Sequence, residues 1–354
     1  MSIVERLKEA LPAQKYNAML IKDPANILFA TGFHTDAGVL LILERGAWFY
    51  TDSRYIEAAA ATISDASVLQ IANESLYTEE IKTILNKYKI TSVGFEESSV
   101  SYSEYLNWEE KFGVKLAPAQ KLLRDMRVAK SADDLAKMIK AQRIAEKSFT
   151  EVLQMISTNM TEKELAAELI YRFLINGADD KSFDTIVVSG PKSSMPHGVP
   201  GDVKIGKGFL TIDFGVRLDG WCSDTTRTLC IGKPDEEMLR VYNTVLQAQL
   251  AGISTARAGV ACCDVDAAAR TVIDNAGYNE CFGHGFGHGV GLEVHEAPTV
   301  SKASKDVLPV GAVISAEPGI YLPGRYGVRI EDVIYITDHG NENITDLTKE
   351  LIIL

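Results

Sequence analysis

The sequence lacks the cysteine pattern of a disulfide-linked or Cys-type zinc protein. Its 354 residues include five cysteines, and no two of them form a Cys-x-x-Cys pair. An odd number of scattered cysteines is typical of a reducing compartment, where the thiol serves as a small buried side chain. We therefore expect a cytoplasmic protein without a disulfide framework.

Long apolar runs and a basic excess are also missing. No run reaches the roughly 18 apolar residues of a membrane-spanning helix. The first residues, Met1–Glu9, have neither the basic start nor the apolar core of a signal peptide. The net charge is −12, which repels nucleic acid and anionic membranes. We expect no nucleic acid and no membrane as partner.

The length of 354 residues and an apolar content of 46% suffice for two globular cores. The composition becomes helical near Leu122–Arg127, so we place the boundary between residues 125 and 126. Residues 1–125 alternate short strands with helices, which indicates an α/β domain. The expected strands are 18–21, 38–43, 47–50 and 91–95, and the expected helices are 55–63, 77–88 and 101–112.

Residues 126–354 combine helices with strands that are expected to form hairpins, an α+β arrangement. Ser131 with Asp134, and Thr161 with Glu164, form capping boxes that predict where two helices begin. The expected helices are 131–155, 161–176, 234–256 and 264–276. The expected strands are 182–190, 209–216, 221–231, 313–322 and 327–336.

The first expected hairpin carries one aspartate on each strand. Asp219-Gly220 between two apolar runs is a strong hairpin signal. Asp213 and Asp224 are almost symmetric about that turn, which predicts that they are cross-strand neighbours about 5 Å apart. Two like charges in that position repel each other unless a cation lies between them.

The second expected hairpin repeats this design with glutamates. Glu317 and Glu331 are equidistant from Gly324 in the connecting turn. A hairpin with that centre places the two carboxylates side by side. Arg329 lies two residues before Glu331, so its side chain points to the same face of the strand.

Three of the six histidines lie in a glycine-rich stretch, at positions 284, 288 and 295. The spacing of His284 and His288 suits a zinc-binding helix. A helix is disfavoured because each interior glycine costs about 1 kcal/mol relative to alanine. Alternating glycines favour a strand or tight loop in which the backbone approaches another group closely.

Two pairs of acids and a histidine among glycines point to one site. Four carboxylates and one imidazole are sufficient ligands for two divalent cations. This oxygen-rich set favours Mn²⁺, Co²⁺ or Fe²⁺ over a Cys-type zinc site. Two cations about 3.5–4 Å apart activate a water and polarise a carbonyl. A single acid in a strand is ordinarily a surface residue, but recurring pairs in apolar strands favour a metal site.

Five motifs, in this order, resemble the pita-bread metallopeptidases, and among them most resemble aminopeptidase P and prolidase. They are Thr211–Gly215, Ser223–Arg227, His284–His295, Ala316–Tyr321 and Val328–Asp332. The resemblance implies an α+β pita-bread (creatinase/aminopeptidase) catalytic domain over residues 126–354. Asn26–Phe33 and Tyr50–Tyr55 resemble the creatinase-like α/β N-terminal domain, which we assign to residues 1–125.

The resemblance implies a metal-dependent Xaa-Pro aminopeptidase or dipeptidase, which hydrolyses the bond between an N-terminal residue and proline. It implies two divalent metal ions, Mn²⁺ first, with Co²⁺, Fe²⁺ or Zn²⁺ as alternatives. The implied ligands are Asp213, Asp224, His288, Glu317 and Glu331. Proline-containing peptides or dipeptides are the expected substrates, and the N-terminal domain is expected to pair two chains in a homodimer.

The resemblance also assigns roles around the metals. Glu317 is expected to carry a proton as well as to bind metal. His197, in the loop Met195–Gly198, and His295 would hold the carbonyl oxygen and the developing tetrahedral centre. His284 would contact the proline side of the substrate, and Arg329 would lie beside the substrate and orient the acidic ligands.

Three alternatives share the fold. A methionine aminopeptidase has the same ligand set, but the separate N-terminal domain and the His284–His288 motif favour the Xaa-Pro branch. Creatinase uses the fold without metal, and the five intact ligands disfavour it. A catalytically inactive pita-bread binding protein is expected to lose ligands, and none is lost here.

Overall fold

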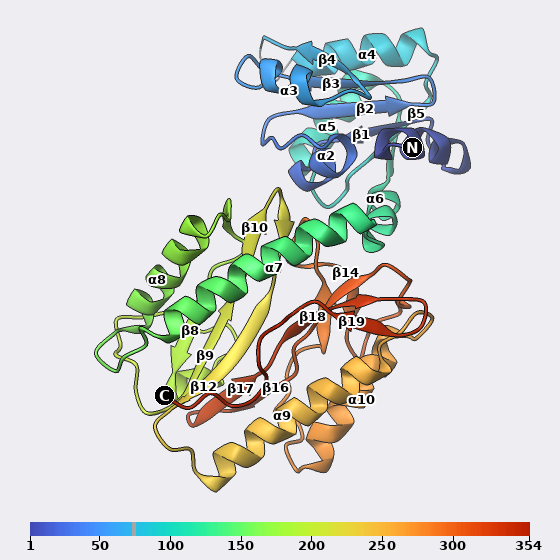
Figure 1. Ribbon diagram of the computed structural model, residues 1–354. Coiled ribbons are helices and arrows are strands. Elements are labelled where there is room, and N and C mark those ends of the chain that lie inside the picture. Colours follow the sequence, from blue (N-terminus) through green and yellow to red (C-terminus); the bar gives the residue numbers. More distant parts are fainter. Residues whose placement is uncertain (73–75) are drawn as a thin grey trace. The chain divides into compact units, whose positions relative to one another are not determined.

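The structure is a computed structural model that describes residues 1–72 and 76–354 (Figure 1). It divides into two units, Met1–Met126 and Arg127–Leu354. No helix among the described residues is both long enough and apolar enough to cross a membrane. The expected α/β domain followed by an α+β domain is confirmed by the order of the elements.

The N-terminal unit is a six-stranded mixed sheet in the order β4-β3-β2-β1-β5-β6. Its strands are β1 Ala18–Ile21, β2 Val39–Leu43, β3 Gly46–Thr51, β4 Ser67–Gln70, β5 Ser92–Phe95 and β6 Lys115–Pro118. Its helices are α1 Ile3–Ala10, α2 Pro24–Thr31, α3 Ile56–Thr62, α4 Tyr77–Lys87, α5 Tyr102–Phe112 and α6 Gln120–Val128. The sequence analysis missed α1, α2, β4 and β6.

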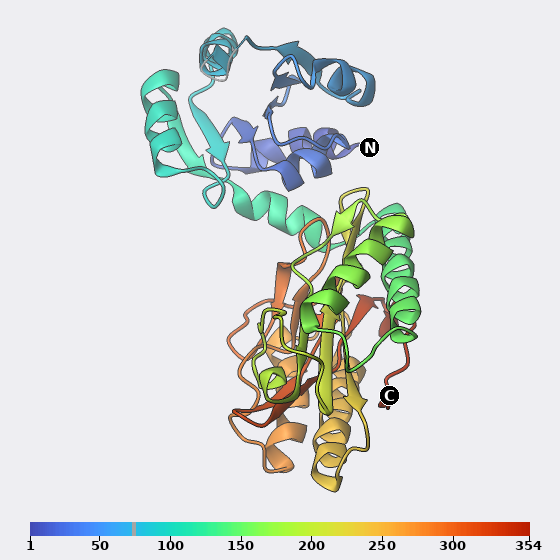
Figure 2. The same cartoon turned by 90° about the vertical axis from the view of Figure 1, so that its left-hand side faces the viewer.

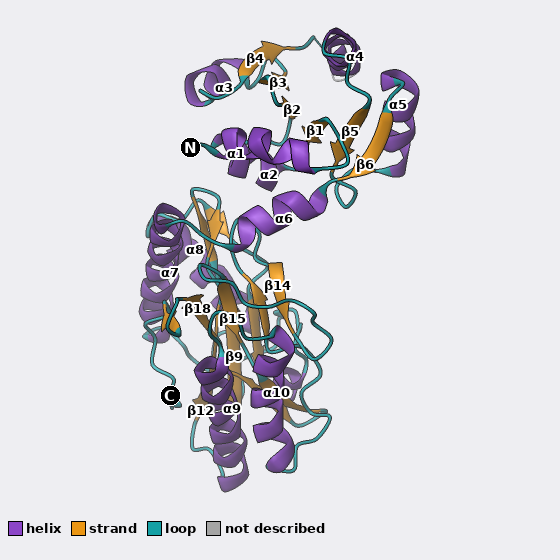
Figure 3. Ribbon diagram, turned by 90° about the vertical axis from the view of Figure 1, so that its right-hand side faces the viewer, coloured by secondary structure: helices purple, strands orange, loops and turns teal. Residues whose placement is uncertain are grey.

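Both faces of this sheet are covered by helices, as Figure 3 shows. Met19 and Ile21 of β1 pack in the cluster that contains residues of α1, α2 and α3. The alternate residues Ala18 and Leu20 pack in the cluster that contains residues of α4 and α5. A strand that is buried on both faces is apolar at every position, which explains the continuous apolar run of β1.

The second unit has four long helices, α7 Ala132–Leu153, α8 Glu162–Ile175, α9 Glu236–Thr255 and α10 Cys262–Asn275. The capping boxes predicted at Ser131 and Thr161 are confirmed, and both hold the first turn of their helix. Helices α7 and α8 share a core with β8 and β9, whereas α9 and α10 share a second core with β15–β18. Strands β9 and β12 therefore lie between two helix pairs (Figure 1).

The strands of this unit are short. They are β7 Asp180–Lys181, β8 Ile186–Ser189, β9 Gly208–Phe214, β10 Val216–Leu218, β11 Trp221–Cys222, β12 Thr225–Ile231, β13 Gly287–Gly289, β14 Glu296–Val300, β15 Val313–Ala316, β16 Gly319–Leu322, β17 Tyr326–Arg329, β18 Asp332–Ile336 and β19 Asn341–Asn343. They form sheets in the orders β11-β10-β7, β12-β9-β8, β14-β13-β15-β18-β19 and β16-β17. The chain ends beside β12, where the amide of Cys230 bonds the carbonyl of Ile352 (Figure 2).

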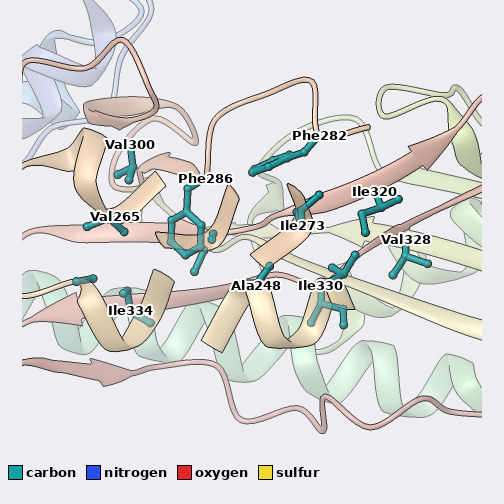
Figure 4. Packing of buried hydrophobic residues seen from close by; sticks show 14 of the residues in the cluster. Ala248, Val265, Ile273, Phe282, Phe286, Val300, Ile320, Val328, Ile330 and Ile334 are labelled. Carbon is teal, nitrogen blue, oxygen red and sulfur yellow. The ribbon is translucent and has the colours of Figure 1, made fainter. Parts of the chain in front are cut away.

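The core around α9 and α10 shows why one helix contains an interior glycine. Phe286, which precedes β13, packs among residues of both helices (Figure 4). A Cβ atom at Gly252 of α9 would lie 2.2 Å from the ring of Phe286. The close approach fixes the position of the segment that leads into β13.

The prediction of four long continuous strands is wrong. It concerned residues 209–216, 221–231, 313–322 and 327–336. Each one breaks into two pieces that belong to different sheets. The breaks fall at Gly215, at Ser223–Asp224, at Glu317–Pro318 and at Ile330–Glu331. Residues 182–190 likewise form a strand only at Ile186–Ser189. Gly215, Asp224 and Pro318 interrupt the apolar pattern at three of these breaks, and Pro318 in particular argues against a continuous strand.

Candidate metal centre

The two aspartates lie near the break in the first hairpin. Asp213 is the penultimate residue of β9 and pairs with Thr226 of β12. Asp224, two residues before Thr226, is therefore a diagonal neighbour of Asp213. The expectation that the two aspartates are directly opposite is wrong by two residues, because the two-residue turn is centred between Asp219 and Gly220.

The two glutamates follow the register that symmetry about Gly324 predicts. Ala316 of β15 pairs with Asp332 of β18, and Gly319 of β16 pairs with Arg329 of β17. Both pairs place Glu317 opposite Glu331. Each glutamate occupies the gap between two sheets, where its backbone is outside the strand ladder.

His288 is the central residue of β13, between two glycines that permit close packing. A Cβ atom at Gly287 would lie 2.1 Å from the carbonyl oxygen of Ser315, and one at Gly289 would lie 2.1 Å from that of Ala297. The expected strand or tight loop is confirmed for this stretch, and a helix is excluded. The glycine alternation thus reflects backbone that approaches other backbone.

The hydrogen bonds of His288 select one tautomer for metal binding. Its Nδ1 lies 3.1 Å from the carbonyl oxygen of Gly289. A ring that donates from Nδ1 keeps the lone pair of Nε2 free for a cation. That Nε2 lies 3.0 Å from Glu317 Oε1 and 3.7 Å from Asp224 Oδ2.

The structure brings five sequence-predicted residues into one group, in which Asp224 and Glu331 are buried and the other three are half-buried. Ligand atoms of Asp224, His288 and Glu331 all lie within 4.8 Å of one another. Glu317 contacts His288, as described above. Asp213 is close enough for its charge to raise the pKa of both Asp224 and Glu331. The group combines residues from five separate strands or strand breaks.

The electrostatics of this group fit bound cations. Burial, and then the charge of neighbouring carboxylates, raises the pKa of Asp224 and Glu331 well above the usual values. Burial also raises the pKa of Asp213, although Arg329 opposes this. For Glu317, burial is outweighed by the hydrogen bond and charge of His288, so that its pKa falls to about 2. Four crowded carboxylates of this kind are stabilised by positive charge.

A second observation also fits a cation. Asp213 Oδ1 is buried and accepts no hydrogen bond within the described part of the chain. Buried polar atoms of this kind almost always have a partner, which can be an ion. The other oxygen, Oδ2, lies 2.6 Å from Arg329 Nη2. The open oxygen and the donor set together fit a divalent metal site.

Arg329 connects the acids to two further segments. It is 4% exposed, and its Nη1 donates to Tyr321 Oη at 2.9 Å and to the carbonyl oxygen of Pro196 at 3.2 Å. Its Nε donates to Thr226 Oγ1 at 3.0 Å. Thr226 in turn donates to Glu331 Oε2 at 2.7 Å. These bonds fix the orientation of the carboxylates on which they act.

Three histidines have different environments. Both ring nitrogens of His284 have partners, since Nδ1 lies 2.9 Å from the carbonyl of Gly285 and Nε2 lies 2.9 Å from Tyr321 Oη. Burial lowers the pKa of His284, which therefore remains neutral. His295 is exposed, and its ring centroid lies 4.1 Å from that of His288. His197 is exposed too, and burial lowers the pKa of His295.

Sequence reasoning missed two hydroxyl residues of the site. Ser315 Oγ lies 3.0 Å from Glu317 Oε1 and accepts from the amide of His288 at 3.0 Å. Thr226 bridges Arg329 and Glu331. Each lies two residues from a predicted ligand, Ser315 from Glu317 and Thr226 from Asp224. The two-residue period of a strand could have identified both.

Comparison with known proteins places the chain in a family. The profile of metallopeptidase family M24 matches residues 136–338, and the profile of the creatinase/prolidase N-terminal domain matches residues 3–129. The chain belongs to metallopeptidase family M24. Membership of this family, as a pita-bread peptidase, makes the chain a metal-dependent hydrolase that uses divalent metal ions.

The relatives are similar over their whole length. The Xaa-Pro dipeptidase of Pyrococcus horikoshii is 36% identical, with 99% of this chain and 98% of that protein covered. The solved structure of a Xaa-Pro dipeptidase from Bacillus anthracis has a TM-score of 0.96 and 38% identity, with 99% of each chain covered. That of an X-Pro aminopeptidase from Thermotoga maritima has a TM-score of 0.91 and 35% identity, with 98% of this chain and all of that chain, 100%, covered.

Proposed function

We propose that this chain is a cytoplasmic, homodimeric Xaa-Pro peptidase that hydrolyses the bond between an N-terminal residue and proline. The convergence of Asp213, Asp224, His288, Glu317 and Glu331 into one group of buried and half-buried side chains carries the proposal. Residues 1–125 form the N-terminal domain in this account, and residues 126–354 form the catalytic domain. Relatives over the full length that are named Xaa-Pro dipeptidase and X-Pro aminopeptidase support the choice of proline.

The five converging residues would hold two divalent metal ions, and we propose Mn²⁺. Carboxylate oxygens with a single imidazole suit this cation, and the soft thiolate ligands that favour zinc are not among the five. When bound, such a pair of ions supplies an activated water and polarises the scissile carbonyl. Asp213 Oδ1, which lacks another partner among the described residues, would be one of the ligand atoms.

The remaining chemistry falls to the protein's own side chains. Glu317, whose Oε1 lies 3.0 Å from His288 Nε2 among the ligand atoms, would accept the proton that the attacking water releases. His295 and His197, both exposed, would donate hydrogen bonds to the carbonyl oxygen as negative charge develops on it. Arg329 would keep Asp213 oriented through their 2.6 Å contact.

His284 differs from the other two histidines in this account. Its ring nitrogens are already bonded, and its ring stands edge-on to Phe282 with a centroid separation of 5.0 Å. We propose that it meets the proline side of the substrate through its ring, as one wall of a recess that also includes Tyr321. Proline suits such a recess because its nitrogen has no N–H that needs an acceptor.

The test compares Met-Pro and Met-Ala peptides of equal length with the Mn²⁺-loaded protein. An ordinary peptide would bury an unpaired N–H at a cost of about 1–3 kcal/mol. We therefore expect kcat/KM to favour Met-Pro by about 10- to 150-fold. Equal rates, or a preference for Met-Ala, would assign the chain to the methionine aminopeptidase alternative instead.

Some relatives are named Xaa-Pro dipeptidase and others X-Pro aminopeptidase. The proposed function therefore includes two kinds of substrate, dipeptides and longer peptides. A comparison of Met-Pro with Met-Pro-Ala, under the same conditions, decides between them. A prolidase cleaves only the dipeptide efficiently, whereas an aminopeptidase P prefers the longer peptide. Cleavage of neither peptide, with metal bound, would favour the inactive binding protein.

A further inference from the structure

One loop carries His197 and lies outside every sheet. It comprises residues 190–201, which we call the His197 loop, and it follows directly after β8. It begins with the short 3₁₀ helix Gly190–Ser194, and its exposed residues include Met195, His197 and Val199. Because a loop of this kind has no strand ladder, other contacts must determine where His197 is held.

Both ends of the His197 loop are bound by one buried carboxylate. Glu162, the first residue of α8, is 1% exposed. Its Oε1 accepts hydrogen bonds from the amide of Ser189 at 2.8 Å and from Ser189 Oγ at 3.3 Å. Its Oε2 accepts from Lys192 Nζ at 2.6 Å and from the amide of Gly201 at 3.1 Å. One side chain therefore ties the start, the 3₁₀ helix and the end of the loop together.

The helix itself does not require this carboxylate. The capping box at the start of α8 is formed by Thr161 and Glu164, and Glu162 takes no part in it. Burial of a charged group is costly unless that group is paired and hydrogen-bonded. The four hydrogen bonds that Glu162 accepts all come from donors in the loop or at its two ends. Its burial therefore serves the loop rather than the helix.

The other side of the loop is bound to the metal centre. Arg329 Nη1 donates to the carbonyl oxygen of Pro196 at 3.2 Å, and Arg329 Nη2 contacts Asp213. The amide of Gly327 donates to Ser193 Oγ at 2.9 Å. His197 directly follows Pro196. Its position therefore depends on the His197 loop, which Glu162 binds at both ends and Arg329 binds at Pro196.

We propose that Glu162 is the positioning residue for His197. Through the two ends of the loop, Glu162 holds the imidazole at the place from which it reaches the substrate carbonyl. Glu162 does not touch the substrate, and its effect passes through His197. The catalytic half of this inference rests on the proposed function, whereas the structural half, that Glu162 holds the loop, does not.

The structural half is tested by amide hydrogen exchange on metal-free protein. Glu162→Gln removes the charge at nearly constant size. We expect the amides of residues 189–201 to exchange about tenfold faster or more, with α8 unchanged. Glu164→Gln, at an exposed position two residues along the same helix, is the matched control and should leave the loop unchanged. Lys192→Met, which removes the cation beside Glu162, should act in the same direction if Glu162→Gln fails to fold.

The catalytic half is tested by a double-mutant cycle with Met-Pro as substrate. Glu162→Gln should lower kcat by about 10- to 100-fold with little change in KM, because a misplaced group affects the reaction more than binding. In a His197→Ala background the same change should reduce kcat less than about twofold further, since coupled residues are not additive. Glu162→Asp keeps a carboxylate, so its kcat should be higher than that of Glu162→Gln.

Two results would overturn the inference. The first is unchanged exchange of residues 189–201 in both Glu162→Gln and Lys192→Met. The second is a full, additive loss of kcat when Glu162→Gln is introduced into the His197→Ala background. If the wild-type protein fails to hydrolyse Met-Pro, the proposed function fails, whereas the exchange comparison still decides whether Glu162 holds the loop.

Discussion

Glu317 and Glu331 lie opposite each other in one antiparallel register, although neither residue belongs to a strand. The pairs Ala316–Asp332 and Gly319–Arg329, in two different sheets, continue the same register on either side of them. The backbone changes its sheet at the glutamates, while the two side chains remain neighbours. This arrangement places two carboxylates at the point where the ladder opens and a cation can reach them.

The ligand assignment predicts the effect of Asp224→Asn. The variant replaces a charged ligand by a neutral one of the same shape, so metal content should fall and kcat/KM should decrease by about 100-fold or more. The metal-free variant should be no less stable than the metal-free wild type, because one of several repelling carboxylates is removed. Elemental analysis, kinetics and thermal unfolding measure the three quantities.

His295→Ala is the matched control for that experiment. His295 is exposed and contacts the ring of His288, but it is not part of the cluster of ligand atoms. We expect this variant to keep its metal and to lose rate. The assignment is wrong if His295→Ala loses metal while Asp224→Asn keeps metal and activity.

Tyr321 should stabilise the protein through its hydroxyl. Its Oη accepts from Arg329 Nη1 and contacts His284 Nε2, both at 2.9 Å. Tyr321→Phe leaves both buried partners without this contact, and we expect the free energy of unfolding to fall by about 1–3 kcal/mol in urea titrations. Tyr326→Phe is the control, because the buried Oη of Tyr326 has no partner among the described residues. Equal losses in the two variants would contradict the role assigned to the Tyr321 hydroxyl.

A buried ion cluster next to His295 should make stability depend on pH. Glu296 Oε1 lies 2.6 Å from Lys130 Nζ, and Oε2 lies 2.5 Å from Arg127 Nη2. Burial of Glu296 is outweighed by these two cations, so its pKa is lowered. A lowered pKa in the folded state gives a contribution that is complete above the unfolded pKa, about 4.3, and lost as pH falls through the folded value.

Glu296→Gln should therefore lower the free energy of unfolding by about 3–5 kcal/mol at pH 7, since it removes the buried carboxylate charge that neutralises Lys130 and Arg127. The difference from wild type should narrow as the pH falls below about 4. Glu293→Gln serves as the control, because Glu293 also contacts Arg127 but its side chain is 50% exposed. That control should cost about 1 kcal/mol or less. A difference that stays constant from pH 7 to pH 3 would contradict the lowered pKa.

We also predict a homodimer. The N-terminal unit has its own sheet and its own two cores, and we propose no catalytic residue within it. Light scattering at micromolar protein should give twice the mass of one chain. A fully active monomer under the same conditions would contradict the assignment of dimerisation to this unit.

The sequence was sufficient to predict the fold class, most helices and the proximity of the acids. Capping boxes at Ser131 and Thr161 predicted two helices because the signal is local. The position of Glu317 against Glu331 followed from symmetry about one turn. These features depend on residues that are close together in the chain, and their physical causes can be recognised in short stretches.

Other features depend on contacts that no short stretch reveals. The strand breaks at Asp224, Glu317 and Glu331 arise because the chain changes its sheet there, and the partner strands that determine this are distant in the sequence. The hydrogen bond at Nε2 of His284 depends on Tyr321, 37 positions away. The contact of Glu162 with Ser189 and Gly201 likewise joins segments 27 and 39 positions apart.

Metal content tests the central claim most directly. The protein is stripped with a chelator, dialysed against Mn²⁺ and then against metal-free buffer, and analysed for bound metal, melting temperature and hydrolysis of Met-Pro. We predict two ions per chain, a higher melting temperature than for the stripped protein, and activity that appears only with the ions. Full hydrolysis of Met-Pro by protein that contains no metal would contradict it.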